Sequence, residues 1–253
     1  MIHSFLLIGQ SNAAGRGLPA EAEPLDTNQK KLKVLRNGRW QTMYRPVNPD
    51  RPFSGTCFAE SFAKAYSDAH PELQVGIIPC ADGGTSLEQW QPNGLLFDNA
   101  LNCARLAMRT SHLVGILWHQ GEADCEAGLY PLYYERFQTI KNALRQELGR
   151  PDIPILVGGL GDFLANCKLS GDLANYPHIN EALQRIAQDD PRCAFVSATG
   201  LSANPDNLHF NAGALKEFGL RYFDALRAFG DTDDALGGSP KENDTARTQM
   251  DLL

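Results

Sequence analysis

Five short apolar runs alternate along the chain with longer segments whose apolar residues recur at helical spacing. Apolar runs of this length indicate strands buried on both faces, and their alternation with helices is typical of a parallel sheet covered on both sides. The sequence therefore predicts a three-layer α/β/α domain in which right-handed crossovers connect successive strands. The expected strands are residues 5–8, 75–79, 113–118, 153–158 and 193–197, and the expected helices are residues 56–69, 95–108, 130–148, 177–188 and 211–229.

Two further runs, residues 32–36 and 39–43, flank the pair Asn37-Gly38. Asn-Gly between such runs favours a tight hairpin. We expect a small β-ribbon that decorates the domain outside a five-stranded parallel sheet. Beyond residue 229 the chain is polar, so we expect one domain over residues 1–229 and a disordered tail over residues 230–253.

The composition is that of an ordinary globular chain, with 43% hydrophobic and 21% charged residues. The net charge of -7 and the lack of a Lys/Arg cluster argue against nucleic acid or an anionic membrane as partner. Six widely spaced cysteines without a C-x-x-C pair favour buried thiols of a reducing compartment. The sequence shows neither a signal-peptide pattern nor an apolar run of membrane-spanning length, so we expect a cytoplasmic protein. No pattern indicates the oligomeric state.

The first strand runs directly into Gly9, which is followed by Gln10, Ser11 and Asn12. Glycine lets the chain turn sharply at the carboxyl end of a strand, the edge where ligands bind in open α/β sheets. A serine placed there beside backbone amides has the surroundings of a nucleophile. Two other interpretations stay open from this segment alone. Ser11 would be the N-cap of the next helix, or the turn would bind phosphate without a Walker lysine or a clean G-x-G-x-x-G.

The other strand ends carry the remaining parts of an acyl-transfer site. His209 is the candidate base, because an imidazole takes up and releases protons near neutral pH. Asp206 precedes it by three residues, so its carboxylate can turn back and fix the imidazole tautomer. A capping histidine and an Asx turn are the structural alternatives. For the oxyanion, the candidate donors are the backbone amides of Ser11 and Gly84 and the side-chain amide of Gln120.

Four residues after the third strand have side chains that can bind metals: His119, Glu122, Asp124 and Cys125. Their spacing fits no standard zinc pattern, and residues so close on one loop seldom converge on one ion. We therefore expect neither a metal nor another cofactor.

Four sequence blocks resemble those of a known superfamily: residues 9–15 (G-Q-S-N-A-A-G), 79–86 (P-C-A-D-G-G-T-S), 118–124 (W-H-Q-G-E-A-D) and 206–209 (D-N-L-H). They are similar to blocks of the SGNH/GDSL hydrolases, in the branch of carbohydrate esterase family 6 acetylxylan esterases and sialate O-acetylesterase (SASA) domains. Each block alone is a weak signal, whereas four in family order are specific. Ala13 replaces the methionine that is usual there, which bears on packing beneath the serine.

This resemblance implies a three-layer SGNH fold with strand order 2-1-3-4-5. It also implies a serine esterase without a cofactor, acting on an acetylated oligosaccharide or another small acetyl ester. The implied roles are Ser11 as nucleophile, His209 as base, Asp206 as acid, Ser11, Gly84 and Gln120 around the oxyanion, and Gln10 and Glu122 as possible supporting residues.

Other functions remain open beside this one. A sialate O-acetylesterase and a general short-chain carboxylesterase would use the same residues. A catalytically silent carbohydrate-binding protein and a flavodoxin-like nucleotide-binding module belong to other classes, and the complete Ser, His and Asp set argues against the silent binder. For a sugar substrate, Trp90 at the end of the second strand's loop is a candidate stacking platform, with core packing as the alternative.

Overall fold

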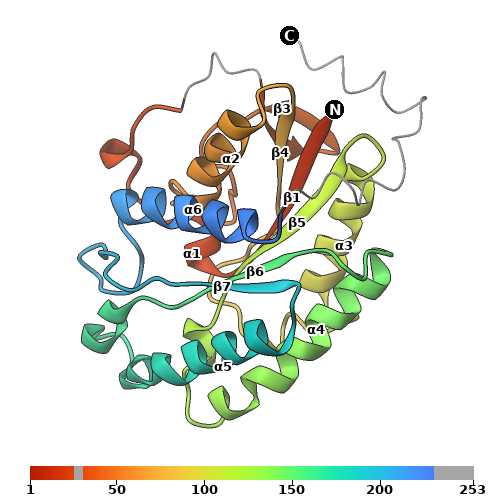
Figure 1. The fold of residues 1–253 in the computed structure, drawn as a ribbon. Coiled ribbons are helices and arrows are strands. Elements are labelled where there is room, and N and C mark those ends of the chain that lie inside the picture. The colour runs from red at the N-terminus through yellow and green to blue at the C-terminus, as the bar shows by residue number, and fades with distance from the viewer. Residues whose placement is uncertain (26–30, 231–253) are drawn as a thin grey trace.

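The computed structural model describes residues 1–25 and 31–230 and contains a central sheet (Figure 1). Its strands are β1 (Ile2–Gly9), β2 (Leu32–Arg36), β3 (Arg39–Thr42), β4 (Gln74–Pro79), β5 (His112–His119), β6 (Ile155–Gly158) and β7 (Cys193–Val196). The seven strands have the order β3-β2-β4-β1-β5-β6-β7. The five predicted strands occupy the consecutive positions β4-β1-β5-β6-β7, so the predicted order 2-1-3-4-5 is confirmed.

The predicted number of strands is wrong, because the hairpin joins the sheet instead of decorating it. β2 and β3 pair antiparallel around Asn37-Gly38, whose φ values of 49° and 75° are those of a tight hairpin turn. β2 also pairs in parallel with β4, with Val34 opposite Ile77. Trp40 of β3 lies over Gly76, where a Cβ would be 2.4 Å from the indole. The hairpin therefore extends the sheet by two strands.

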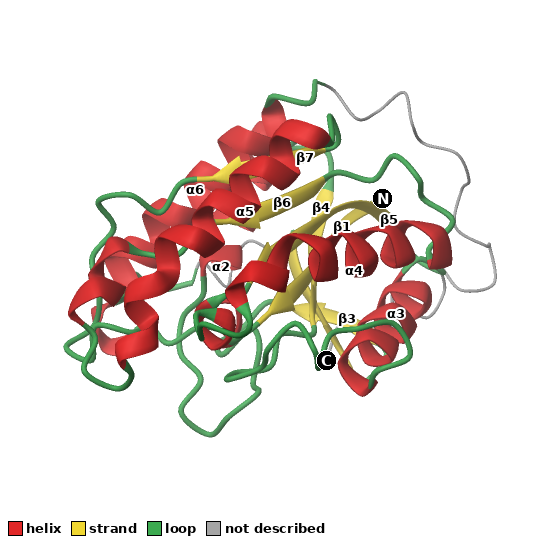
Figure 2. Cartoon of the chain, turned by 90° about the horizontal axis from the view of Figure 1, so that it is seen from below, coloured by secondary structure: helices red, strands yellow, loops and turns green. Residues whose placement is uncertain are grey.

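Helices cover both faces of this sheet (Figure 2). One face carries α2 and α6, and the other carries α3, α4 and α5 (Figure 1). The predicted helices are confirmed to within a few residues at each end. The α-helices are α1 (Ser11–Ala14), α2 (Phe58–Ala69), α3 (Leu95–Ala107), α4 (Tyr133–Glu147), α5 (Tyr176–Asp189) and α6 (Ala212–Arg227). The short 3₁₀ helices are η1 (Pro19–Glu21), η2 (Glu122–Asp124), η3 (Tyr130–Leu132), η4 (Asp162–Asn166) and η5 (Gly171–Asn175).

The side chains of β1 contribute alternately to the two cores. Leu6 and Ile8 pack in the core beneath α3, α4 and α5, whereas Phe5 and Leu7 pack in the core beneath α2 and α6. All four are fully buried, as predicted for a strand covered on both faces. Both cores therefore fix β1, and with it the position where the strand ends.

Gly9 ends β1 with a positive φ of 128°, directly against β5. A Cβ at this position would lie 1.9 Å from the carbonyl oxygen of His119. The same oxygen accepts a hydrogen bond from the N–H of Gln10 at 2.9 Å. Only glycine permits this approach and this backbone conformation together. Gly9 thus turns the chain so that Ser11 lies at the edge of the sheet.

We expect Gly9→Ala to lower the free energy of unfolding by about 3 kcal/mol, because a steric clash and an unfavourable φ act together. Gly149→Ala is the matched control, since Gly149 also has a positive φ (63°) but its Cβ would meet open space. Urea unfolding of both variants gives the comparison. Equal losses in the two variants would contradict the clash with β5.

The structure also bears on the cysteines, the start of α6 and the expected tail. All six cysteines are free thiols and five are buried, which confirms the expectation of buried thiols. Asn211 is the N-cap of α6, where its side chain accepts a hydrogen bond from the Ala214 N–H. The expected tail lies outside the described residues, apart from Gly230. None of the described helices is both long and apolar enough to cross a membrane.

Candidate active site

Ser11 is the first residue of α1, a single helical turn at the carboxyl end of β1. The N-cap of this turn is Gln10, and no side chain caps it, so the interpretation of Ser11 as an N-cap is wrong. Ser11 is 7% exposed, and its Oγ lies 3.1 Å from His209 Nε2. The predicted serine and histidine therefore meet at hydrogen-bond distance, although 198 residues separate them.

Asp206 and His209 lie in the loop between β7 and α6. Asp206 Oδ2 accepts a hydrogen bond from His209 Nδ1 at 2.7 Å. Its Oδ1 accepts the backbone N–H groups of Leu208 and His209, at 2.9 and 3.0 Å. Partial burial acts to raise the pKa of Asp206, but these hydrogen bonds outweigh it and leave the pKa below its usual value. The carboxylate is therefore held in its ionised form beside the imidazole.

This arrangement has the connectivity of a Ser-His-Asp triad. With Nδ1–H directed at Asp206, the neutral imidazole presents an unprotonated Nε2 to the Ser11 hydroxyl. The hydroxyl can donate its proton there as it attacks a carbonyl, and the carboxylate stabilises the imidazolium that results. The geometry is suited to nucleophilic acyl transfer.

The backbone amides of Ser11 and Gly84 remain available as oxyanion donors. Among the described residues, neither N–H donates to a protein acceptor, whereas the Gly83 N–H donates to Asp50 Oδ2 at 2.9 Å. A Cβ built on Gly83 would lie 3.5 Å from the Ser11 Cβ, so this loop is beside Ser11. Gly84 is exposed and has a positive φ of 80°. Two of the three predicted donors therefore have free N–H groups.

The prediction that Gln120 supplies a third donor is wrong. Its side chain is fully buried, and Nε2 donates to the Thr85 carbonyl at 3.1 Å and to Asp124 Oδ2 at 2.5 Å. Both amide hydrogens are used, so none remains for an oxyanion. Asp124 also accepts the Leu87 N–H at 2.9 Å. Gln120 and Asp124 thus join the loop after β4 to the loop after β5.

Gln10 and Asn12, on either side of Ser11, hold the surrounding loops. Gln10 Oε1 accepts the N–H groups of Gly121 and Ala123, at 3.1 and 3.3 Å. Asn12 Oδ1 accepts the Phe210 N–H at 3.0 Å, and Asn12 Nδ2 donates to the Leu208 carbonyl at 3.2 Å. Asn12 therefore connects the turn that carries Ser11 to the loop that carries His209, on both sides of His209. The local sequence around Ser11 does not indicate this role of Asn12, because these partners lie 196 and 198 positions away.

Glu122 lies beneath this turn and does not touch His209 within hydrogen-bond distance. Its Oε1 accepts from Asn12 Nδ2 at 2.5 Å and lies 3.4 Å from His119 Nε2. Burial acts to raise the pKa of Glu122, but the nearby His119 ring and the Asn12 amide outweigh it and leave the pKa lowered. The described residues contain no group of three or more His, Cys, Asp or Glu side chains arranged to hold a metal ion. Glu122 is thus placed to support Asn12.

Trp90 is not a stacking platform, and that prediction is wrong. The side chain is 1% exposed, and its indole packs edge-on against Trp118 with ring centroids 5.6 Å apart. Its Nε1 donates to Thr85 Oγ1 at 3.0 Å. The alternative of core packing is correct.

A buried ion pair on the other side of Ser11 was missed. Arg16 and Asp50 pair through two hydrogen bonds of 3.0 and 2.7 Å, with side chains 6% and 3% exposed. Burial acts to raise the pKa of Asp50, but hydrogen bonds from Arg16, Ser54 and the Gly83 N–H outweigh it and lower the pKa. Because Asp50 binds the Gly83 amide, the pair fixes the loop that carries Gly84. A separation of 34 residues hides this pair from local sequence patterns.

We expect Asp50→Asn to lower the free energy of unfolding at neutral pH by about 3 kcal/mol, because it leaves a buried guanidinium without its counter-charge. A carboxylate with a lowered folded-state pKa stabilises above its unfolded pKa, and this contribution is lost as the pH falls through the folded pKa. The difference in free energy of unfolding between the wild type and Asp50→Asn should therefore become smaller in acid. Urea unfolding curves recorded over a pH series measure this difference.

Asp68→Asn is the control for this experiment, because its pair with Lys64 is exposed on both sides and should contribute little. A stability gap for Asp50→Asn that stays constant with pH would contradict the ionic role.

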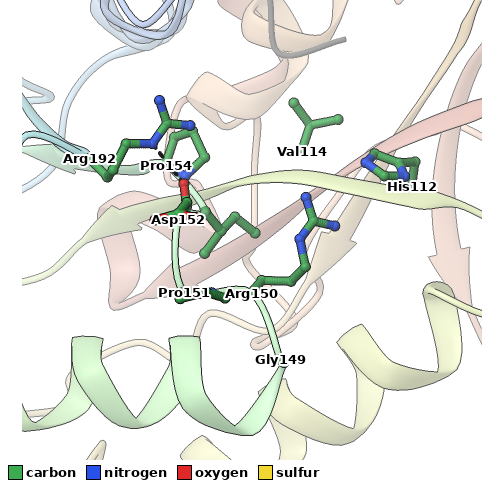
Figure 3. Close-up of a pocket in the computed structure, with 9 residues that line it drawn as sticks. His112, Val114, Gly149, Arg150, Pro151, Asp152, Pro154 and Arg192 are labelled. Carbon is green, nitrogen blue, oxygen red and sulfur yellow. Dashed lines mark hydrogen bonds between the residues drawn. The ribbon is translucent and has the colours of Figure 1, made fainter. Parts of the chain in front are cut away.

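A cavity of about 110 Å³ lies away from this site (Figure 3). His112, Pro154 and Arg192 line it, at or next to the first residues of β5, β6 and β7. The cavity therefore opens at the amino edge of the sheet, whereas Ser11 lies at the carboxyl edge. The cavity is therefore separate from the candidate active site.

The family of this chain follows from its match to a known protein family. Residues 1–228 match the family described as carbohydrate esterase, sialic acid-specific acetylesterase. The chain belongs to this family. A probable carbohydrate esterase of Arabidopsis thaliana is 27% identical over 248 residues, which cover 85% of this chain and 86% of the relative. The family resemblance drawn from the four sequence blocks is confirmed.

Solved structures share the fold of this carbohydrate esterase. A protein from Arabidopsis thaliana has a TM-score of 0.78 at 23% identity, covering 89% of this chain and 98% of its own. A carbohydrate acetylesterase from Xanthomonas citri has a TM-score of 0.68 at 22% identity, covering 91% of this chain and 57% of its own. The three-layer fold agrees with both. As a member of this family, the protein is a carboxylic ester hydrolase.

Proposed function

We propose that this esterase removes acetyl groups from carbohydrate hydroxyls through a serine acyl-enzyme. The observation that carries the proposal is the chain of contacts from Ser11 Oγ to His209 Nε2 (3.1 Å) and from His209 Nδ1 to Asp206 Oδ2 (2.7 Å). Family membership supports ester hydrolysis, and the Xanthomonas citri carbohydrate acetylesterase supports an acetylated sugar as the substrate class.

In the first half-reaction Ser11 Oγ attacks the acetyl carbonyl while His209 Nε2 takes the hydroxyl proton. The carbonyl oxygen becomes an oxyanion, which the N–H groups of Ser11 and Gly84 stabilise. As the tetrahedral intermediate collapses, its bond to the sugar oxygen breaks. His209 returns the proton to that oxygen, so the sugar leaves as a free alcohol and the acetyl group stays on Ser11.

The second half-reaction repeats these roles with water. His209 takes a proton from a water molecule as it attacks the acetyl-serine carbonyl. Collapse of this intermediate releases acetate, and the proton returns to Ser11 Oγ. Asp206 keeps the imidazole oriented throughout and stabilises its charged form. His209 carries out every proton transfer in both half-reactions, and the proposed mechanism uses no cofactor.

The surroundings of Ser11 support a short acyl group. Ser11 belongs to the turn that follows Gly9, and the Gly83-Gly84 loop lies beside it, so glycine backbone adjoins the serine. Acetyl esters should therefore be cleaved well and chains beyond butyryl poorly.

Two measurements test the proposed function: acetate release from acetylated xylo-oligosaccharides and O-acetylated sialic acids, and octanoate release from octanoyl esters. We expect release from an acetylated sugar and little cleavage of octanoyl esters. The better of the two sugars decides between an acetylxylan and a sialate substrate. A folded protein that binds sugar and releases no acetate would establish the silent binder, and efficient octanoyl cleavage would indicate a lipase-like enzyme.

A further inference from the structure

Phe53 is an aromatic side chain held in solvent close to the candidate nucleophile. It is 69% exposed, in contrast to the buried Trp90 and Trp40. Its ring lies 5.3 Å from the Arg16 guanidinium carbon. Single exposed apolar side chains are common on protein surfaces, so it is the position of Phe53 beside the candidate site that makes it relevant to binding.

The position of Phe53 relative to Ser11 follows from Gly83. A Cβ built on Gly83 would lie 2.5 Å from Arg16 Nη2 and 3.5 Å from the Ser11 Cβ. The guanidinium beneath the Phe53 ring and the nucleophile therefore flank the same glycine. Phe53 therefore lies on the side of Ser11 where Arg16 and Gly83 are.

The loop that carries Phe53 is fixed at both of its ends. Asp50 forms the buried pair with Arg16, and its Oδ1 accepts the Ser54 hydroxyl at 2.6 Å. The Arg51 N–H donates to Ser54 Oγ, and the Ser54 N–H donates to the Arg51 carbonyl, both at 3.0 Å. A fixed aromatic ring can bind without first losing conformational freedom.

Arg51, two residues before Phe53, carries polar groups that join this loop to the loop after β4. Arg51 donates to the Gly83 carbonyl at 3.0 Å and pairs with Asp82 at 2.8 Å. Both side chains of this pair are partly exposed, at 41% and 33%. Arg51 also donates to the Asp50 carbonyl at 2.9 Å, and Asp82 Oδ1 is buried. The guanidinium has five N–H groups, so donors beyond these contacts and Asp82 Oδ2 remain for a ligand. An apolar face beside paired donors and acceptors matches a sugar ring, which has C–H faces and a rim of hydroxyls.

We propose that Phe53, with the Arg51–Asp82 pair, forms the subsite for the sugar ring that carries the acetyl group. This rests on the proposed function, since it places the alcohol portion of the same substrate. The C–H face of the ring packs on Phe53, and its hydroxyls bind Arg51 and Asp82. The subsite replaces the one expected at Trp90.

The test compares an acetylated xylo-oligosaccharide with ethyl acetate, whose leaving group is too small to reach the ring. We expect Phe53→Ala to lower kcat/KM for the acetylated sugar about tenfold more than for ethyl acetate, mainly through KM. Phe53→Tyr keeps the ring and should retain the wild-type preference. The melting temperature should change little in either variant, because the side chain is exposed.

Equal losses on both substrates, or no loss on either, would overturn the subsite. A wild-type protein that cleaves neither substrate would instead contradict the proposed function, so the two failures are distinct. Arg51→Lys is a second variant, because it keeps the charge but loses the planar donor set. A preference for the sugar that survives both Phe53→Ala and Arg51→Lys would also contradict the proposal.

Discussion

An enzyme with Ser11→Ala is expected to lose a factor of about 10⁴ to 10⁶ in acetyl-ester turnover while it folds like the wild type. Ser11 Oγ hydrogen bonds only to His209 within the described residues, so its removal leaves no buried donor that depended on it. The loss should appear in kcat, because the missing bond forms only during the reaction. Acetate release and a urea unfolding curve of the same preparation measure both effects.

Ser197→Ala is the matched control for this experiment. Ser197 also follows the carboxyl end of a strand, β7, but it is exposed and bonds to Thr199 Oγ1 at 3.0 Å. This variant should keep wild-type turnover. A Ser11→Ala enzyme that retains more than about a tenth of the activity would show that another group attacks the ester.

The alternation of apolar runs and helical segments was enough to predict the core of the fold. Each run packs on both faces, and parallel strands need crossover helices, so few arrangements satisfy the pattern. The place of the hairpin could not be predicted in this way. It depends on Trp40 packing over Gly76, a contact between residues far apart in sequence. Nothing in residues 32–43 alone shows that they join β4.

The contacts among Ser11, His209 and Asp206 could be predicted because chemistry and topology agree. Ser11, Asp206 and His209 all follow strands of one parallel sheet, so they emerge at one edge. The error at Trp90 arises because a tryptophan after a glycine loop can lie in the core or on a binding surface. The sequence does not distinguish the two, because the difference depends on tertiary packing. The error at Gln120 had a local signal, since Asp124 follows four residues later and competes for the same amide. Phe53 lacked a signal, because its site depends on the distant pair of Arg16 and Asp50.

The second large effect on turnover is expected when Asp206, the proposed acid, is replaced. Asp206→Asn should lower turnover by about 10⁴ with the fold intact, because an amide can stabilise the wrong tautomer of His209. The carboxylate accepts three hydrogen bonds, from His209 Nδ1 and from two backbone N–H groups. An asparagine can accept only through its carbonyl oxygen and would place an amide N–H against one of these donors. Steady-state kinetics and the melting temperature of the variant measure the result.

Glu122→Gln is the comparison that tests this assignment. Among the described residues, Glu122 is connected to the loop that carries His209 through Asn12, whose Nδ2 also donates to the Leu208 carbonyl. A residue that acts through another should change the position of His209 without controlling its tautomer, so its loss should be smaller than that of Asp206→Asn. Near-normal turnover in Asp206→Asn, together with collapse in Glu122→Gln, would move the acid to Glu122. That outcome would require the Asn12 bridge to rearrange during turnover, because Glu122 now contacts Asn12 and His119 rather than His209.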